Sequence, residues 1–88
     1  MGAKRVTWSE LKRRRAGEPE VQAGYERSRR AYELGVQVRE LRLARGLSQA
    51  ALGELAGTTQ QAIARIENGG VMPTLDSLGR IGAALGAD

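Results

Sequence analysis

The sequence contains no cysteine, no histidine and no phenylalanine. The first two absences exclude imidazole and thiolate catalysis, zinc–thiolate sites and disulfide bonds. No cluster of the remaining side chains supplies a nucleophile with its base or a set of metal ligands. We therefore expect a protein that is not an enzyme and that needs neither a metal nor another cofactor.

Long apolar runs are missing as well. No stretch of about 18 apolar residues is present, so the sequence predicts no membrane span. The chain starts with the basic segment 1–5, but no apolar segment follows it, which argues against secretion and for a cytoplasmic location. Its 88 residues allow one domain with a modest core and no pocket of the size typical of enzymes.

The most informative pattern that is present covers residues 48–69, which predict two short helices joined by a tight turn. Ser48 can cap the first helix by accepting a hydrogen bond from a backbone N–H one turn further on, and Gly57 can end that helix in a left-handed conformation. Thr58 is expected to start the second helix, with Gln61 completing a Thr-x-x-Gln capping box.

Helical spacing divides the side chains of this segment between two faces. The inward positions are apolar: Leu52, Ala56, Ile63 and Ile66. The outward positions on the second helix are polar: Thr59, Gln60, Gln61 and Arg65. Glutamine can form two hydrogen bonds with adenine, arginine can do the same with guanine, and a threonine methyl group suits thymine. This layout is typical of a helix-turn-helix that reads DNA with its second helix.

Residues 36–86 resemble the Cro/phage-repressor type of helix-turn-helix, the Xre family. Residues 57–61 resemble the recognition segment of lambdoid phage repressors, and the motifs around them have that family's spacing: Leu41-Arg42, Arg45-Gly46-Leu47-Ser48-Gln49, Ile66-Glu67-Asn68-Gly69, Pro73 and Leu75. The resemblance implies an all-α fold, with a five-helix Cro/phage-repressor-like helix-turn-helix domain over residues 35–88 after an N-terminal helical extension over residues 1–34. It also implies a homodimer that binds a palindrome in double-stranded operator DNA and so associates with the nucleoid.

The same resemblance implies roles for single residues. Arg42 and Glu67 match positions that pair as a buried or half-buried salt bridge. Gln49 and Asn68 match phosphate-contacting positions, although Asn68 could instead end the recognition helix in a left-handed conformation beside Gly69. Gln61 could turn back into its capping box, and Arg65 could be a solvated surface charge. The full set of candidate DNA contacts is Gln49, Thr58, Thr59, Gln60, Gln61, Arg65 and Asn68.

All three aromatic residues lie before the predicted helix-turn-helix. The motifs Trp8-Ser9-Glu10-Leu11, Pro19-Glu20-Val21 and Tyr25-Glu26, placed before such a domain, resemble antitoxins of the HigA type. This second resemblance implies a RelE- or HigB-like toxin as partner and repression of the protein's own operon. Because aromatic side chains are enriched at protein interfaces, the candidate toxin contacts are Trp8, Leu11, Tyr25 and Tyr32.

Two alternatives to this antitoxin hypothesis remain open. Trp8 and Leu11 could fold back on Val21 and Tyr25 as a small satellite core. The protein could also be a stand-alone transcriptional or phage-type repressor without a toxin.

Further helices are expected on both sides of residues 48–69. A capping box of Thr7 and Glu10 predicts a short helix over residues 8–15, which Gly17 ends. Pro19 suits the first position of the next helix. The apolar stripe of that helix is expected at Val21, Tyr25, Ser28 and Tyr32, continuing to Val38 and Leu41.

Two more features of the predicted helices are marked by Gly35 and Pro73. Gly35, within the stripe just described, could be a hinge, a close helix contact or a tolerated residue. The last helix follows Pro73, with Thr74 as its cap and with inward positions at Leu75, Leu78, Ile81 and Leu85.

The net charge of +4 is unevenly distributed. Residues 1–35 carry nine basic and five acidic side chains, whereas residues 36–88 carry five of each. The predicted DNA-binding domain is therefore neutral, and its phosphate contacts must come from helix N-termini and amides rather than from a broad basic face. We expect weak binding by a monomer, for which dimerisation is the usual remedy. The basic run 12–15 could meet solvent, an acidic patch or DNA backbone.

Overall fold

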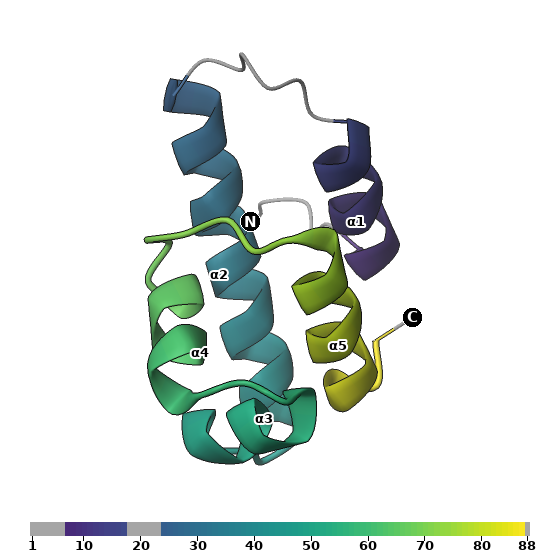
Figure 1. The fold of residues 1–88 in the computed structure, drawn as a ribbon, viewed down its shortest axis with the longest axis vertical. Coiled ribbons are helices and arrows are strands. Elements are labelled where there is room, and N and C mark those ends of the chain that lie inside the picture. The colour runs from purple at the N-terminus through teal and green to yellow at the C-terminus, as the bar shows by residue number, and fades with distance from the viewer. Residues whose placement is uncertain (1–6, 18–23, 88) are drawn as a thin grey trace.

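The structure, a computed structural model, describes residues 7–17 and 24–87 of the chain. This part is all α, as predicted, and contains five helices and no strand: α1 (Trp8–Gly17), α2 (Gly24–Ala44), α3 (Gln49–Ala56), α4 (Gln60–Glu67) and α5 (Leu75–Leu85). Figure 1 shows α2 as the long central helix, with α4 and α5 to either side of it and α3 at its lower end. No helix in the described ranges combines the length and apolar character that crossing a bilayer requires.

The buried face of α2 differs from the predicted stripe. Ala31, Leu34 and Val38 are buried, whereas Ser28 and Tyr32 are exposed, Tyr32 to 64%. The stripe is wrong at these two positions because α4 packs on α2 through the neighbouring face, which carries Gly35. Val21 and the side chain of Tyr25 lie outside the described residues.

Gly35 marks a close contact between two helices. A Cβ at this position would lie 2.7 Å from the carbonyl oxygen of Glu67 at the end of α4, which is closer than real Cβ contacts come. Helix α2 continues through Gly35 without a break. The predicted boundary between an extension ending at residue 34 and a domain starting at residue 35 therefore falls within one helix.

The N-terminal helix α1 belongs to the main hydrophobic core. Trp8 and Leu11 are each 3% exposed and share one buried cluster with residues of the other four helices: Leu34, Val38, Leu52, Ala56, Ile63, Ile66, Leu78, Ile81 and Leu85. Helix α1 packs on α5, where Gly82 makes room for the indole of Trp8, because a Cβ there would collide with the ring.

This burial corrects the sequence-based hypotheses about Trp8 and Leu11. Neither side chain is on the surface, so in this fold neither is placed for the predicted toxin contact. The alternative, a separate small core, is also replaced, since both residues extend the core that the other four helices share.

Several predicted helix ends are present. Glu10 N donates to Thr7 Oγ1 at 3.1 Å and Thr7 N donates to Glu10 Oε1 at 3.2 Å, which is the predicted capping box. Helix α1 extends to Gly17. Thr74 caps α5 by accepting a hydrogen bond from Ser77 N at 3.1 Å. Pro19 lies outside the described residues.

The inner face of α5 follows the predicted spacing except at its start. Leu78, Ile81 and Leu85 are buried to within 2% of full burial, whereas Leu75, the first residue of the helix, is 46% exposed. Helix α5 packs on α3 and on α1.

Candidate nucleic-acid interface

Helix α3 begins and ends at the predicted residues. Ser48 Oγ accepts a hydrogen bond from Ala51 N at 3.0 Å, and Gly57 follows the helix with a φ of 74°. Thr58 N donates to Gly53 O at 2.7 Å, so Thr58 still takes part in closing α3.

The second helix starts one residue later than predicted. Thr59, not Thr58, is the N-cap: its backbone is extended, and its Oγ1 accepts a hydrogen bond from Ala62 N at 3.1 Å. The predicted capping box from Thr58 to Gln61 is therefore wrong, because the N–H of Thr58 is used to end α3. As a consequence, Gln61 is the second residue of α4 and has no capping role.

The turn between the helices lies close against α3. A Cβ at Gly53 would be 2.9 Å from the carbonyl carbon of Thr59. Both this atom and its carbonyl oxygen belong to the backbone, which cannot swing aside as a flexible side chain can. Gly53 therefore costs α3 some helix propensity but lets the N-terminus of α4 sit tightly on α3.

Helix α4 separates an apolar face from a polar one as predicted. Ile63 and Ile66 are buried, and Leu52 and Ala56 of α3 are buried with them. The exposed side chains are Thr59, Gln60, Gln61, Arg65 and Asn68, while Thr58 is half-buried. The first turn of α4 thus presents two adjacent glutamine amides to solvent from a helix whose other face is fixed in the core.

The conformation of Asn68 at the end of α4 differs from one of the two alternatives predicted for this residue. Asn68 has a φ of −83°, so it does not end the helix in a left-handed conformation. That conformation belongs to Gly69, whose φ is 76°. The side chain of Asn68 is exposed just beyond the recognition helix.

A buried polar network joins α2, α3 and α4. Arg42 donates to both carboxylate oxygens of Glu67, at 2.6 Å from Nε and 3.0 Å from Nη2, and Nη1 donates to Leu47 O at 2.9 Å. Gln49 Nε2 donates to Glu67 Oε1 at 3.1 Å. The hydrogen bonds that Arg42 donates to Glu67 raise the pKa of Arg42, burial lowers it in part, and the negative charge of Glu67 raises it further. Because the side chain of Glu67 is only 1% exposed, loss of Arg42 would leave a buried charge without its main partner.

This network fixes the start of α3 beside the end of α4. Gln49, the first residue of α3, is half-buried and uses one amide hydrogen on Glu67. Its amide nitrogen carries a second hydrogen, which is the group that the predicted phosphate contact requires. The first residues of a helix also leave backbone N–H groups free, which favours an anion at that end.

Comparison with known proteins agrees with this geometry. A family model described as helix-turn-helix matches residues 38–88, more than half of the chain. The chain belongs to the helix-turn-helix family. It is a DNA-binding regulator of the Xre/Cro type, a family that is in general not enzymatic. No curated protein and no solved structure matched the chain.

The candidate toxin contacts that the structure describes are divided between the core and the surface of this helix-turn-helix protein. Trp8 and Leu11 are buried, Tyr32 is exposed on α2, and the side chain of Tyr25 is outside the described residues. Sequence reasoning missed Gly53 and Gly82 as residues that allow close approaches. Their partners, Thr59 and Trp8, belong to other elements, so no local pattern could have shown the contacts.

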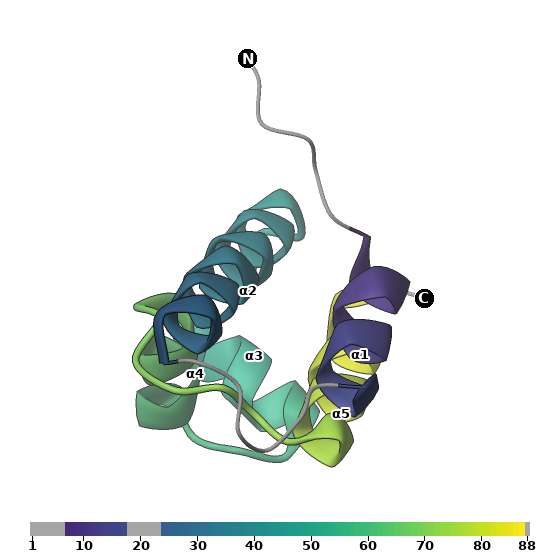
Figure 2. The same ribbon diagram turned by 90° about the horizontal axis from the view of Figure 1, so that it is seen from above.

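The basic run 12–15 lies away from the recognition helix. Both views place α1 and α4 on opposite sides of the molecule (Figures 1 and 2). Two of its arginines have partners within the fold: Arg14 Nη1 lies 3.3 Å from Glu33 Oε1, and Arg15 Nε donates to Pro73 O at 3.0 Å. The run therefore contributes in part to holding α1 in place.

Proposed function

We propose that the protein is a sequence-specific transcriptional repressor that reads operator bases with the first turns of α4. The observation that carries this proposal is the exposed pair Gln60 and Gln61 at the start of a helix whose opposite face is fixed in the core. Because a glutamine amide both donates and accepts, each can form two hydrogen bonds to an adenine edge in the major groove. Thr59 supports the same reading, since its hydroxyl is engaged as the cap and its methyl group remains for thymine.

Other exposed side chains would hold the protein in register on the duplex. Arg65, one turn further along α4, is placed for a base edge or a nearby phosphate, and Thr58 precedes the helix at the turn. Gln49 and Asn68, at the start of α3 and the end of α4, are the proposed phosphate contacts. Phosphate contacts position a protein on DNA, whereas base contacts give specificity.

We further propose that the protein binds as a homodimer. Residues 36–88 carry equal numbers of basic and acidic side chains, so one copy gains little general attraction to DNA. Two copies related by a two-fold axis would insert two recognition helices into successive major grooves. The operator is then a palindrome.

A footprint on DNA selected from a random pool tests this function. The expected result is one inverted repeat whose half-site centres lie about 10 base pairs apart, or 34–36 Å. A single unrepeated half-site, saturated by a monomer, would contradict the dimer. Absence of any enriched sequence would contradict sequence-specific binding itself.

The antitoxin function is a second candidate. It is supported by Tyr32, an exposed aromatic side chain whose backbone lies beside Gly69. The burial of Trp8 and Leu11 removes the other described contacts on which the hypothesis rests. Calorimetry against the product of the neighbouring reading frame tests it: binding that Tyr32→Ala weakens supports an antitoxin, and no binding leaves a repressor without a toxin.

A further inference from the structure

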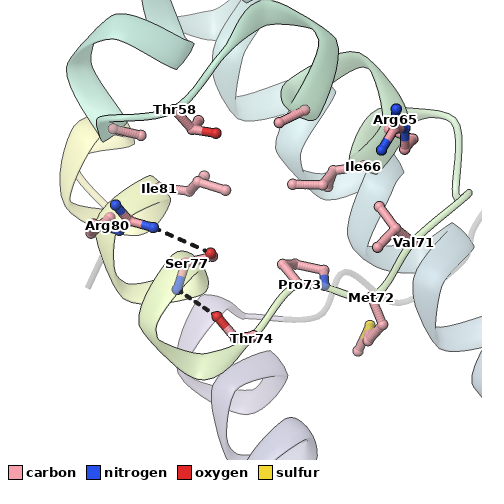
Figure 3. Close-up of a pocket in the computed structure, with 12 residues that line it drawn as sticks. Thr58, Arg65, Ile66, Val71, Met72, Pro73, Thr74, Ser77, Arg80 and Ile81 are labelled. Atoms are coloured by element: carbon pink, nitrogen blue, oxygen red, sulfur yellow. Dashed lines mark hydrogen bonds between the residues drawn. The ribbon is translucent and has the colours of Figure 1, made fainter.

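A groove opens between α4, the loop after it and α5. Its volume is about 260 Å³, and its apolar floor includes Ala56, Ile66, Pro73 and Ile81. Figure 3 shows Ile66 and Ile81 pointing toward one another from opposite walls, with Thr58 at one end and Pro73 at the other. Water in such a groove contacts mostly apolar atoms, so an apolar occupant that displaced it would be favoured.

The rim of the groove is positively charged. Arg65 of α4 and Arg80 of α5 lie at its opposite edges, and none of the residues that line it is acidic (Figure 3). Arg80 Nη2 donates to Ser77 Oγ at 3.4 Å, and its Nε lies 3.5 Å from Asp76. Asp76 is 85% exposed and four residues away on the same helix, so this ion pair is a weak competitor for the guanidinium group.

We propose that the groove binds a small monocarboxylate with an apolar body. The body would lie between Ile66 and Ile81, and the carboxylate would accept hydrogen bonds from Arg65 or Arg80 at the rim. The apolar floor alone would suit any hydrophobic molecule, but two guanidinium groups without an acidic neighbour among the lining residues select an anion. The volume is slightly below that of typical pockets for drug-sized ligands, which favours a compact acid.

Binding would be coupled to DNA recognition through Arg65. This residue both lines the groove and lies on the exposed face of the recognition helix. A carboxylate that pairs with it withdraws a positive charge from the DNA-facing surface and adds a negative charge next to phosphates. Operator affinity should therefore fall when the acid is bound, and by linkage operator DNA should weaken binding of the acid by the same factor. This coupling rests on the proposed DNA-binding function, whereas the binding of the acid does not.

NMR titration of the full chain with octanoate and with 3-phenylpropionate tests the binding itself. The expected result is saturable shifts of the amide signals of Ile66, Ser77 and Ile81. Octanol, which has the same apolar body without the charge, should bind about tenfold more weakly, as should the variants Arg65→Gln and Arg80→Gln. Arg39→Gln is the matched control, because Arg39 is an exposed arginine outside the groove and should leave the affinity unchanged.

A second variant distinguishes the contribution of the apolar groove from that of the charges at its rim. Ala62→Leu leaves both arginines in place but fills part of the groove from α4, and it should abolish the shifts while the protein stays folded. A fluorescence titration of operator DNA with and without saturating acid then measures the coupling. Weaker operator binding in the presence of the acid, absent in Ala62→Leu, is expected.

Each contrary result has a defined meaning. Absence of saturable binding by either acid overturns the proposal, as do equal affinities for octanoate and octanol or an unchanged affinity of both arginine variants. If the arginine variants lose DNA affinity and neither acid binds, the groove serves DNA phosphates instead, which also overturns it. Acid binding that leaves operator affinity unchanged overturns the coupling alone, and it does not bear on whether the protein binds an operator.

Discussion

Helices α1 and α4 are both short, both begin at a threonine cap and lie on opposite sides of the molecule, but they use their side chains in opposite ways. The largest apolar residues of α1, Trp8 and Leu11, are in the core. The two glutamines in the first turn of α4, Gln60 and Gln61, are in solvent. A cap determines where a helix begins. The packing partner of that helix then determines which side chains stay exposed and available to bind another molecule.

The packing partners explain the difference. Helix α5 offers α1 a slot at Gly82, and the indole of Trp8 fills it. Helix α4 packs on α2 and α3 through Ile63 and Ile66, so Gln60 and Gln61 on its other face stay exposed. Helix α1 is accordingly a structural element of the helix-turn-helix protein, and α4 is the element that we propose reads DNA bases.

The largest expected effect follows from removing the anchor of α1. Trp8→Ala should lower the free energy of unfolding by about 3–5 kcal/mol, because it deletes a fully buried ring and leaves a cavity in the shared core. Part of this cost is offset by relief of the indole N–H, which is buried and has no hydrogen-bond partner among the described residues. Urea denaturation measures the loss.

Tyr32→Ala is the matched control for this variant. It removes an aromatic ring that is 64% exposed, so its effect on stability should be within about 0.5 kcal/mol. Similar losses for the two variants would contradict the distinction between a buried α1 anchor and a surface aromatic. Below its unfolding transition, Trp8→Ala should bind operator DNA as tightly as the original protein.

A smaller effect, on DNA rather than on stability, is expected at α4. Gln60→Ala should cost about 1–3 kcal/mol on operator DNA and leave binding to a scrambled duplex nearly intact, because a base contact carries discrimination. Gln49→Ala is the comparison variant and should weaken binding to both duplexes alike, since a phosphate contact is independent of sequence. Equal losses on the two duplexes for Gln60→Ala would remove its base-reading role.

The smallest effect is expected from the basic side chains of α1. The double variant Lys12→Gln with Arg13→Gln should leave the salt dependence of operator binding unchanged, because α1 lies on the side opposite to α4. Each phosphate contact contributes about 0.9 to the slope of log K against log salt concentration. A slope reduced by that amount would place these residues on the DNA backbone.

The parts of this comparison that could be predicted from the sequence depend on local pattern. The inward positions 52, 56, 63 and 66 and the outward position 60 follow from helical spacing alone. The caps Ser48 and Thr74 follow from the preference of short hydroxyl side chains for helix starts. The pairing of Arg42 with Glu67 could be expected only from the family resemblance, because these residues are far apart in the sequence.

The parts that could not be predicted depend on contacts between distant residues or on competition within a turn. Thr58 and Thr59 are chemically equivalent caps, and the hydrogen bond from Thr58 N to Gly53 O decides between them. Trp8 is of a residue type that is enriched at interfaces. Only its close approach to Gly82, more than seventy positions away, shows that it is a core residue. Which face of α2 is buried likewise depends on the approach of α4 at Gly35.

The central claim, that Gln60 reads a base, is tested most directly by a double-mutant cycle across the interface. Each adenine of the operator half-site is replaced in turn by 7-deazaadenine, which lacks the N7 acceptor that a glutamine amide uses. Operator affinity is then measured for the original protein and for Gln60→Ala on each duplex. At one adenine the substitution should weaken the original protein by about tenfold but leave the variant unchanged, which gives a coupling energy of at least about 1 kcal/mol. Additive losses at every adenine would contradict base reading by Gln60.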